Sequence, residues 1–446
     1  MAEKPGTARW SAAATLTLSI LGSSVLPIPF AFSKMGVLVG LLTMAIVAGS
    51  NCLTSNLLLG AAFKTGNASY EGIAEAAGGR RWKAVTQTSL ILLLVGTLIG
   101  DWCLLSDVGP RALQRLTAPT PSPAWLVGSS GRGTMILLAM LVVLPMCLLR
   151  RMRSLELAAS AGATVIIAII AIVVHAAIST GFPAIATGEL PLYTLQISKD
   201  LPEAFSILGY GFYLQPMMLP LLAEMPAGSL GVKLTNQAMC LVTLIVAPAV
   251  YGMLGIFGAA RYGAATQGDM LVNTWLHGRA EGILDLATTL YLSISIPPMQ
   301  MSLRYTLDCL IAGEHAPYSR ARHWAETLGI VLATLATSAA YPQYSEKIFA
   351  ITGATAVCLV CYVIPVAIHL KLRARSRQPP ESDMQADAQD ALLEDPAETP
   401  KLSIRARVWQ GSFGQVVVPL AVAAMGVLFS LAALWVSTAS WIHLPL

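Results

Sequence analysis

Two hydrophobic segments carry glycine and proline near their middles, where a membrane helix would normally be unbroken. The first interruption spans residues 22–29 (GSSVLPIP) and the second spans residues 209–216 (GYGFYLQP). Glycine is weakly committed to helix and proline removes a backbone donor, so each stretch frees polar backbone groups. Lipid cannot satisfy these groups, which persist only inside protein or along a wet cavity. Paired interruptions of this kind are typical of the binding site of a transporter.

The backbone at such breaks suits a small zwitterion. Half-helices that begin there present free N–H groups and the positive end of a helix dipole, which favour a carboxylate. We therefore predict that the carboxylate binds at Gly22, Ser23 and Ser24. The rest of the pocket, with a close backbone approach and aromatic walls, is predicted to come from Tyr210, Gly211 and Phe212. The alternative is that these small residues only allow helices to pack closely.

The composition indicates a polytopic membrane protein. Of 446 residues, 55% are hydrophobic and 12% are charged, against roughly 25% charged in soluble domains. The mean hydropathy is +0.66. The sequence has no basic face interleaved with aromatic residues, which argues against nucleic-acid binding. It has no phosphate-binding loop, no zinc motif and no nucleophile with a nearby base, so we expect neither an enzyme nor a bound cofactor.

A window of about 20 residues, the length of a membrane span, predicts an all-α protein with eleven spans. They cover residues 12–33, 36–63, 85–108, 133–149, 155–178, 201–224, 234–257, 282–303, 325–340, 346–369 and 411–440. We divide the chain into a short cytosolic tail (1–11), a ten-helix core (12–369), a cytosolic linker (370–410) and a last helix with a short outer tail (411–446). The linker is acidic in its middle and poor in aromatic residues, so we expect part of it to be disordered.

The orientation follows from the positive-inside rule. Lysine and arginine are more frequent in the loops that would be cytosolic if the N-terminus were cytosolic, which places the C-terminus outside. Spans one and six then run in opposite directions, and both are interrupted. We therefore expect spans 1–5 and 6–10 to form two five-helix units of inverted topology, with the eleventh span appended.

Several stretches together resemble the amino acid/auxin permease family, and most closely its sodium-coupled neutral amino acid transporters. They are residues 19–36 (SILGSSVLPIPFAFSKMG), 69–71 (SYE) with Gly78, 105–110 (LSDVGP), 144–155 (LPMCLLRRMRSL), 219–224 (LPLLAE) and 296–298 (IPP). The resemblance covers most of the chain. It implies a LeuT-like fold of eleven spans, with helices 1 and 6 discontinuous, and secondary active transport of amino acids driven by sodium or protons.

The resemblance also implies where a coupling sodium ion would bind. A LeuT-like protein would use carbonyls before the first break and hydroxyls on the eighth span, here Ile20, Leu21, Thr288, Thr289, Ser293 and Ser295. Buried hydroxyls more often bond to their own helix carbonyls. The sodium-coupled members commonly carry Asn about four residues before the Gly-Ser pair, where this chain has Leu18. This departure favours proton coupling or uncoupled transport as an alternative.

Asp101 is a charged residue inside the third predicted span, where charge is costly and usually functional. It is a candidate for binding a proton or the amino group of a substrate. The alternative is a hydrated or paired residue in an outer vestibule.

These observations predict an alternating-access transporter, coupled to sodium or protons, that carries an amino acid, with a neutral one favoured. Its partners would be this substrate and the lipid bilayer, and the sequence does not indicate an oligomeric state. The plasma membrane is the favoured location, and an endolysosomal membrane is the alternative. An amino acid sensor of the same fold with little transport is the second hypothesis for function.

Overall fold

The computed structural model describes residues 10–118, 132–149, 156–194, 199–226, 228–313, 317–341, 345–376 and 413–442, apart from residues 11, 15, 18 and 19. Within these ranges the chain forms helices joined by turns, and no strand occurs there. The expectation of an all-α protein is therefore confirmed. The predicted linker 370–410 lies mostly outside the described residues, although its first part continues a helix to Ser376.

The first half of the chain contains one long helix after another. Its elements are η1 (Ser23–Val25), α2 (Ile28–Met35), α3 (Val37–Thr65), α4 (Tyr70–Gly78), α5 (Arg80–Thr117), α7 (Arg132–Leu138), η2 (Ala139–Val143), α8 (Leu144–Cys147), α9 (Glu156–Ser179) and α10 (Pro183–Ala186). The sequence explains the local ends. Gly66 has φ of +69°, which terminates α3, and the Ser69 side chain accepts a hydrogen bond from the Gly72 amide at the start of α4.

The second half follows the same pattern and ends in a separate helix. Its elements are α11 (Leu201–Gly211), α12 (Gln215–Glu224), α13 (Ser229–Leu241), η4 (Val242–Val246), α14 (Ala247–Tyr262), η5 (Gly263–Ala265), η6 (Met270–Val272), α15 (Arg279–Ile311), α16 (Arg320–Ala340), α17 (Ser345–Thr352), η7 (Gly353–Val363), α18 (Ile364–Ser376), η8 (Phe413–Val417) and α21 (Val418–Ile442).

Six helical stretches of the described chain are long and apolar enough to cross a membrane. They are Val37–Thr65, Arg80–Thr117, Leu201–Glu224, Ser229–Ala265, Lys347–Arg375 and Gly414–Thr438. They coincide with the second, third, sixth, seventh, tenth and eleventh predicted spans. Helices also occupy the other five predicted positions, where membrane crossing stays a prediction.

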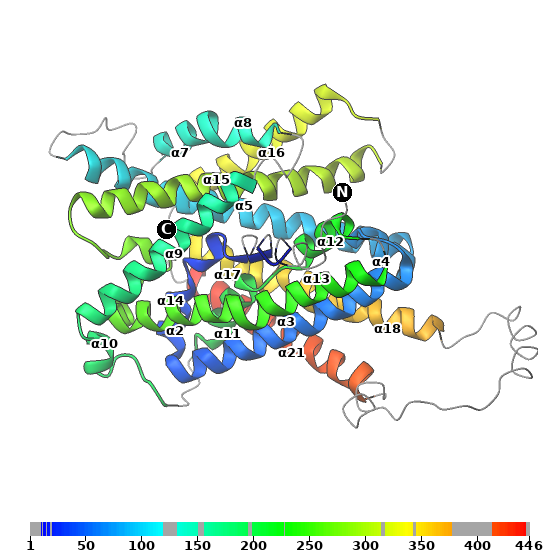
Figure 1. Cartoon of the computed structure of the whole chain (residues 1–446), viewed down its shortest axis with the longest axis horizontal. Helices are drawn as coiled ribbons and strands as arrows, with labels where there is room; N and C mark the ends of the chain where they lie inside the picture. The colour runs from blue at the N-terminus through cyan, green and yellow to red at the C-terminus, as the bar shows by residue number, and fades with distance from the viewer. Residues whose placement is uncertain are drawn as a thin grey trace, which may run out of the picture.

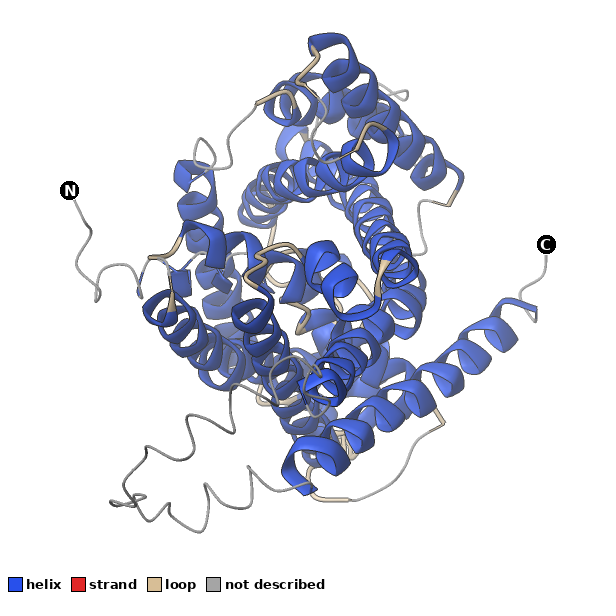
Figure 2. Cartoon of the chain, turned by 90° about the vertical axis from the view of Figure 1, so that its right-hand side faces the viewer, coloured by secondary structure: helices blue, strands red, loops and turns tan. Residues whose placement is uncertain are grey.

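The helices run mostly along one long axis of the molecule (Figure 1). Viewed along this axis, the last helix, α21, lies at the outside of the bundle (Figure 2), and it is the least buried of the six membrane-capable helices. In the interior, α5 packs along α15 and also contacts α16 and α17. The two long helices therefore pack as a pair inside the bundle.

Both predicted interruptions are present in the structure. The described residues from Trp10 to Ile20 are helical, and the chain then bends before the short turn η1 and the start of α2. In the sixth predicted span, α11 ends at Gly211 and α12 begins at Gln215, with three residues between them outside any helix. The elements α2 and η1 both contact α11. The inverted relation between the two five-helix units stays a prediction.

The third predicted span is longer than expected. It was predicted to end at residue 108, before Gly109 and Pro110, but α5 continues through Pro110 to Thr117. A proline removes only one amide donor from a helix. The added turns are held by ion pairs, since Arg111 binds Asp269 at 3.2 Å and Arg115 binds Asp285 at 2.6 Å.

Candidate functional site

A small cavity lies where the two interruptions meet. Gly22, Ser23 and Ser24 line it from the first segment, and Tyr210 and Tyr213 line it from the sixth. The other walls come from α5 and α15, through Thr97, Asp101, Ser295 and Met299. Its volume is about 20 Å³, which is room for about one water molecule. An amino acid would enter this site only if the surrounding segments moved apart.

Asp101 is the charged residue of this cavity. Its side chain lies well inside α5 and is 2% exposed. No hydrogen-bond partner for its Oδ1 atom occurs in the described part of the chain. The structure therefore places Asp101 beside the breaks. A buried carboxylate oxygen without a partner is costly, and a proton or an ammonium group would satisfy it.

Tyr251 of α14 connects the two interruptions directly. Its hydroxyl lies 3.0 Å from the carbonyl oxygen of Ile20 and 2.6 Å from that of Gly211. It also lies 3.3 Å from the Ser24 hydroxyl. A tyrosine hydroxyl has one proton, so it donates to one of these oxygens at a time. Tyr251 therefore ties the end of the first half-helix to the end of α11.

The residues predicted from the sixth segment divide into two groups. Tyr210 lines the cavity, and its ring stacks on Phe349 with 4.7 Å between centroids. Gly211 and Phe212 face Tyr251 instead. A Cβ added at Gly211 would lie 3.3 Å from the Tyr251 ring, and the Phe212 ring packs edge-on against the Tyr251 ring with 5.1 Å between centroids. Gly211 therefore permits the close approach of Tyr251, while Tyr210 shapes the cavity.

The residues predicted to hold sodium make other contacts in this structure. The Ile20 carbonyl accepts hydrogen bonds from Ser24 and Tyr251, and the Leu21 carbonyl accepts one from Tyr291 at 3.0 Å. On α15, each predicted hydroxyl donates to a carbonyl three or four residues earlier, at Thr288, Thr289, Ser293 and Ser295. Of these four hydroxyl residues, Ser295 lines the cavity.

Gln215 fixes the start of α12 beside the break. The side chain is fully buried, and its amide nitrogen donates to Asn51 Oδ1 at 3.3 Å and to Thr54 Oγ1 at 3.2 Å. Its amide oxygen accepts the Leu214 N–H at 3.1 Å and the Cys361 S–H at 2.9 Å. These contacts join the sixth segment to α3 and η7 through one side chain.

Several residues of this site were not predicted from the sequence. Tyr213 and Gln215 stand inside the interrupted motif 209–216, so that motif could have named them. Thr97 and Met299 lie in ordinary apolar stretches, and only the packing of α5 and α15 brings them to the cavity. A single tyrosine in an apolar helix gives a weak signal, which is why Tyr251 was not expected.

A loop between α14 and α15 covers the outer side of the first break in the proposed orientation. The Met270 amide donates to the Leu26 carbonyl, and Met270 and Leu271 are buried. The loop is fixed by Asp269, which accepts from the Leu271 amide at 2.9 Å and pairs with Arg111. Burial raises the pKa of Asp269, and the charge of Arg111 partly offsets this effect.

Asp285 forms a second ion pair near this loop. The Asp285 side chain is fully buried in the first part of α15 and pairs with Arg115. Arg115 also pairs with Glu281 at 3.3 Å. These contacts extend the link between the ends of α5 and α15.

A family model described as "Transmembrane amino acid transporter protein" matches residues 5–390. The chain belongs to this family. The resemblance to amino acid permeases is therefore confirmed, and because the transmembrane amino acid transporter family is a family of transporters, the chain is not expected to act as an enzyme.

Three relatives illustrate the family. "Solute carrier family 38 member 10" of Homo sapiens is 26% identical over 376 residues, which cover 81% of this chain and 32% of the relative. "Putative sodium-coupled neutral amino acid transporter 10" of Xenopus laevis is 25% identical, over 82% of this chain and 35% of the relative. "Amino acid transporter AVT6C" of Arabidopsis thaliana is 22% identical, over 80% of this chain and 84% of the relative. The chain thus spans about a third of the length of the first two.

Proposed function

We propose that this chain is a secondary active transporter that binds a neutral amino acid between its two interrupted helices and works by alternating access. The family supports the substrate class. The observation that carries the proposal is the cavity that both interruptions share with Asp101. In the proposed arrangement the core has a LeuT-like inverted repeat, and the N-terminus is cytosolic.

The cavity offers complementary groups for a zwitterion. The backbone N–H groups of Gly22, Ser23 and Ser24 would suit the carboxylate, because the first turn after a break has donors that a continuous helix would satisfy. The Asp101 carboxylate suits the ammonium group or a coupling proton. The apolar side chain would then lie toward the rings of Tyr210 and Tyr213.

A proton is favoured over sodium as the coupling ion. The Ile20 carbonyl accepts the Ser24 hydroxyl proton and also lies within hydrogen-bonding distance of the Tyr251 hydroxyl. The hydroxyls of α15 are engaged with their own helix. A sodium ion would have to displace these contacts, whereas a proton at Asp101 would satisfy an oxygen that now has no partner within the described chain.

Uptake of radiolabelled neutral amino acids into proteoliposomes tests the proposal, with proton and sodium gradients imposed separately. We expect a proton gradient to drive accumulation and a sodium gradient alone to have little effect. The Asp101→Asn variant should lose proton-driven accumulation, whereas Asp107→Asn, on the same helix but outside the cavity lining, should keep it.

Three outcomes would contradict parts of this proposal. Accumulation driven by sodium alone would reassign the coupling ion to the carbonyls of Ile20 and Leu21. Equal uptake without either gradient would exclude coupled transport. Binding of amino acids without flux would replace the transporter with a sensor.

A further inference from the structure

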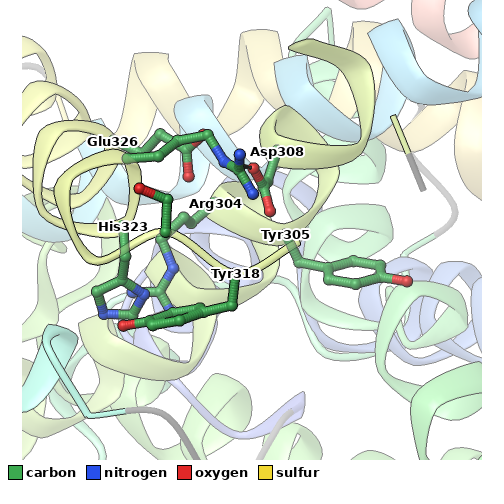
Figure 3. A pocket seen from close by; sticks show the side chains of 8 residues that line it. Arg304, Tyr305, Asp308, Tyr318, His323 and Glu326 are labelled. Carbon is green, nitrogen blue, oxygen red and sulfur yellow. Dashed lines mark ion pairs between the residues drawn. The ribbon is translucent and has the colours of Figure 1, made fainter. Parts of the chain in front are cut away.

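A second and larger cavity lies at the ends of α15 and α16. Its volume is about 220 Å³, and it shares no lining residue with the cavity at the helix breaks. Charged side chains dominate its lining, with Arg304 and Asp308 from α15 and Arg322, His323 and Glu326 from α16. Figure 3 shows Arg304, Asp308, His323 and Glu326 gathered together, with Tyr318 beside His323. In the proposed orientation this end of the helices is cytosolic.

The basic side of this pocket is held rigidly. Arg304 is 9% exposed, and its Nη1 atom donates to the Cys147 carbonyl at 2.8 Å and to Thr327 Oγ1 at 3.0 Å. Among the described residues, no partner contacts the other nitrogens of this guanidinium group. His323 is fixed by the Leu148 carbonyl, 3.3 Å from its Nε2 atom. A guanidinium group with free donors is suited to an oxyanion.

The acidic side of the pocket consists of two carboxylates near one arginine. Arg322 pairs closely with Asp308 and lies 3.9 Å from Glu326 Oε1. The Glu326 side chain is 11% exposed, and its carboxyl group interacts with the carboxyl group of Asp308. A carboxyl pair of this kind would be satisfied by a cationic donor.

The charges of the pocket are balanced. By formal charge, the two arginines Arg304 and Arg322 match the two carboxyl groups Asp308 and Glu326. A simple anion or cation would therefore be repelled by half of the site. A ligand with an oxyanion and an ammonium group matches both halves.

The surface near the pocket is apolar and aromatic. Exposed fractions are 63% for Tyr305, 71% for Ile311 and 56% for Trp324, and the ring of Tyr305 projects away from the charged groups (Figure 3). Aromatic side chains at helix ends are typical of the interface between lipid and water. A ligand of this pocket would therefore come from the bilayer more readily than from solution.

We propose that this pocket binds the headgroup of an aminophospholipid with a primary ammonium group, of the phosphatidylethanolamine type. The phosphate lies against Arg304 and His323, and the ammonium group donates to Asp308 and Glu326. A trimethylated headgroup has the same charges but no N–H donor, so it cannot satisfy Glu326. This inference requires a membrane location but does not depend on transport.

Native mass spectrometry of the purified full chain tests the proposal. The protein in detergent is mixed with equal amounts of phosphatidylethanolamine, phosphatidylcholine and phosphatidylglycerol that carry the same acyl chains. We expect phosphatidylethanolamine to be retained about tenfold better than phosphatidylcholine, as for one charge-assisted hydrogen bond. The Glu326→Gln variant should lose this preference, while Glu75→Gln, which removes an exposed ion pair with Lys83, should keep it.

Several outcomes of this experiment would contradict the proposed lipid site. Equal retention of phosphatidylethanolamine and phosphatidylcholine by the wild type would overturn the proposal, as would an unchanged preference in Glu326→Gln. Stronger retention of phosphatidylglycerol would show a site for anions. If Glu326→Gln does not fold, His323→Gln provides a second variant, which should weaken retention of phosphatidylethanolamine; unchanged retention would contradict the assigned phosphate position.

Discussion

Replacement of Gln215 by methionine should weaken the fold and the substrate site together. Methionine has a similar volume but cannot form the four side-chain hydrogen bonds of Gln215. Among the described residues, the Leu214 N–H and the Asn51 Oδ1 atom would lose their hydrogen-bond partner, and so would the Cys361 S–H, which is a weaker donor. The cost is set mainly by the first two groups. Each buried unsatisfied group costs about 1–3 kcal/mol, so we expect a loss of about 2–6 kcal/mol of stability. This is a large share of the typical 5–15 kcal/mol of a folded protein.

The functional consequence follows from the position of Gln215. It is the first residue of α12, directly after the break that ends at Leu214. With its contacts to Asn51 and Thr54 removed, the break would populate several conformations, and the substrate would bind to only some of them. Uptake measurements in proteoliposomes, normalised to folded protein, should therefore show a raised KM with a smaller change in the maximal rate.

Gln300→Met is the matched control for this experiment. Gln300 is similarly buried in α15. Among the described residues, its side chain makes one hydrogen bond, to the Thr327 carbonyl at 3.2 Å, and its Oε1 atom has no partner. We expect its replacement to change stability by about 1 kcal/mol or less. Equal unfolding free energies and equal KM values for the two variants would refute the role assigned to Gln215.

Three further predictions concern the surroundings of the breaks. Burial raises the pKa of Asp269, and Arg111 partly opposes this effect. Protonated Asp269 therefore stabilises the fold below its unfolded pKa of about 3.9, and this stabilisation is lost as the pH rises through the folded pKa. The melting temperature of Asp269→Asn relative to wild type should increase over this range. Gly353→Ala places a Cβ 2.3 Å from the Ser206 carbonyl, and overpacking should cost about 1–3 kcal/mol in thermal unfolding. Tyr251→Phe removes the bridge between the breaks, with a loss of about 1–2 kcal/mol and a raised KM in uptake.

Each of these predictions has a result that would contradict it. If the melting temperature of Asp269→Asn relative to wild type fell as the pH rose, the pKa of Asp269 would be lowered by folding and not raised. Gly49→Ala is the control for Gly353, because nothing lies within 4 Å of an added Cβ there; a helical alanine at this position should be neutral or stabilising by about 0.5–1 kcal/mol. Wild-type KM for Tyr251→Phe would show that the bridge is not needed for substrate binding.

The sequence predicted the breaks because their causes are local. Glycine and proline change the backbone wherever they stand, so residues 22–29 and 209–216 could be recognised without any tertiary information. The same local rule failed at Pro110, because distant partners stabilise the continuation of α5: Arg111 and Arg115 reach residues of the α14–α15 loop and of α15. Tertiary contacts also decide that Gly211 faces Tyr251 and not the cavity.

The structure also explains how an unwound segment is stable inside a membrane protein. Unwinding frees carbonyls that a helix would have satisfied, and every such group needs a new partner. Three of them find partners on other elements: the Ile20 carbonyl at Tyr251, the Leu21 carbonyl at Tyr291 and the Leu26 carbonyl at the Met270 amide. These partners come from α14, α15 and the loop between them.

The same three contacts constrain how the site can open. The cavity of about 20 Å³ is too small for an amino acid, so binding requires the first segment to move relative to α14, α15 or their loop. Any such movement breaks at least one of these hydrogen bonds and leaves a buried carbonyl, which costs about 1–3 kcal/mol unless water or substrate replaces the partner. Substrate and water entering the opened cavity can supply these partners, so opening and occupation of the site would be energetically linked.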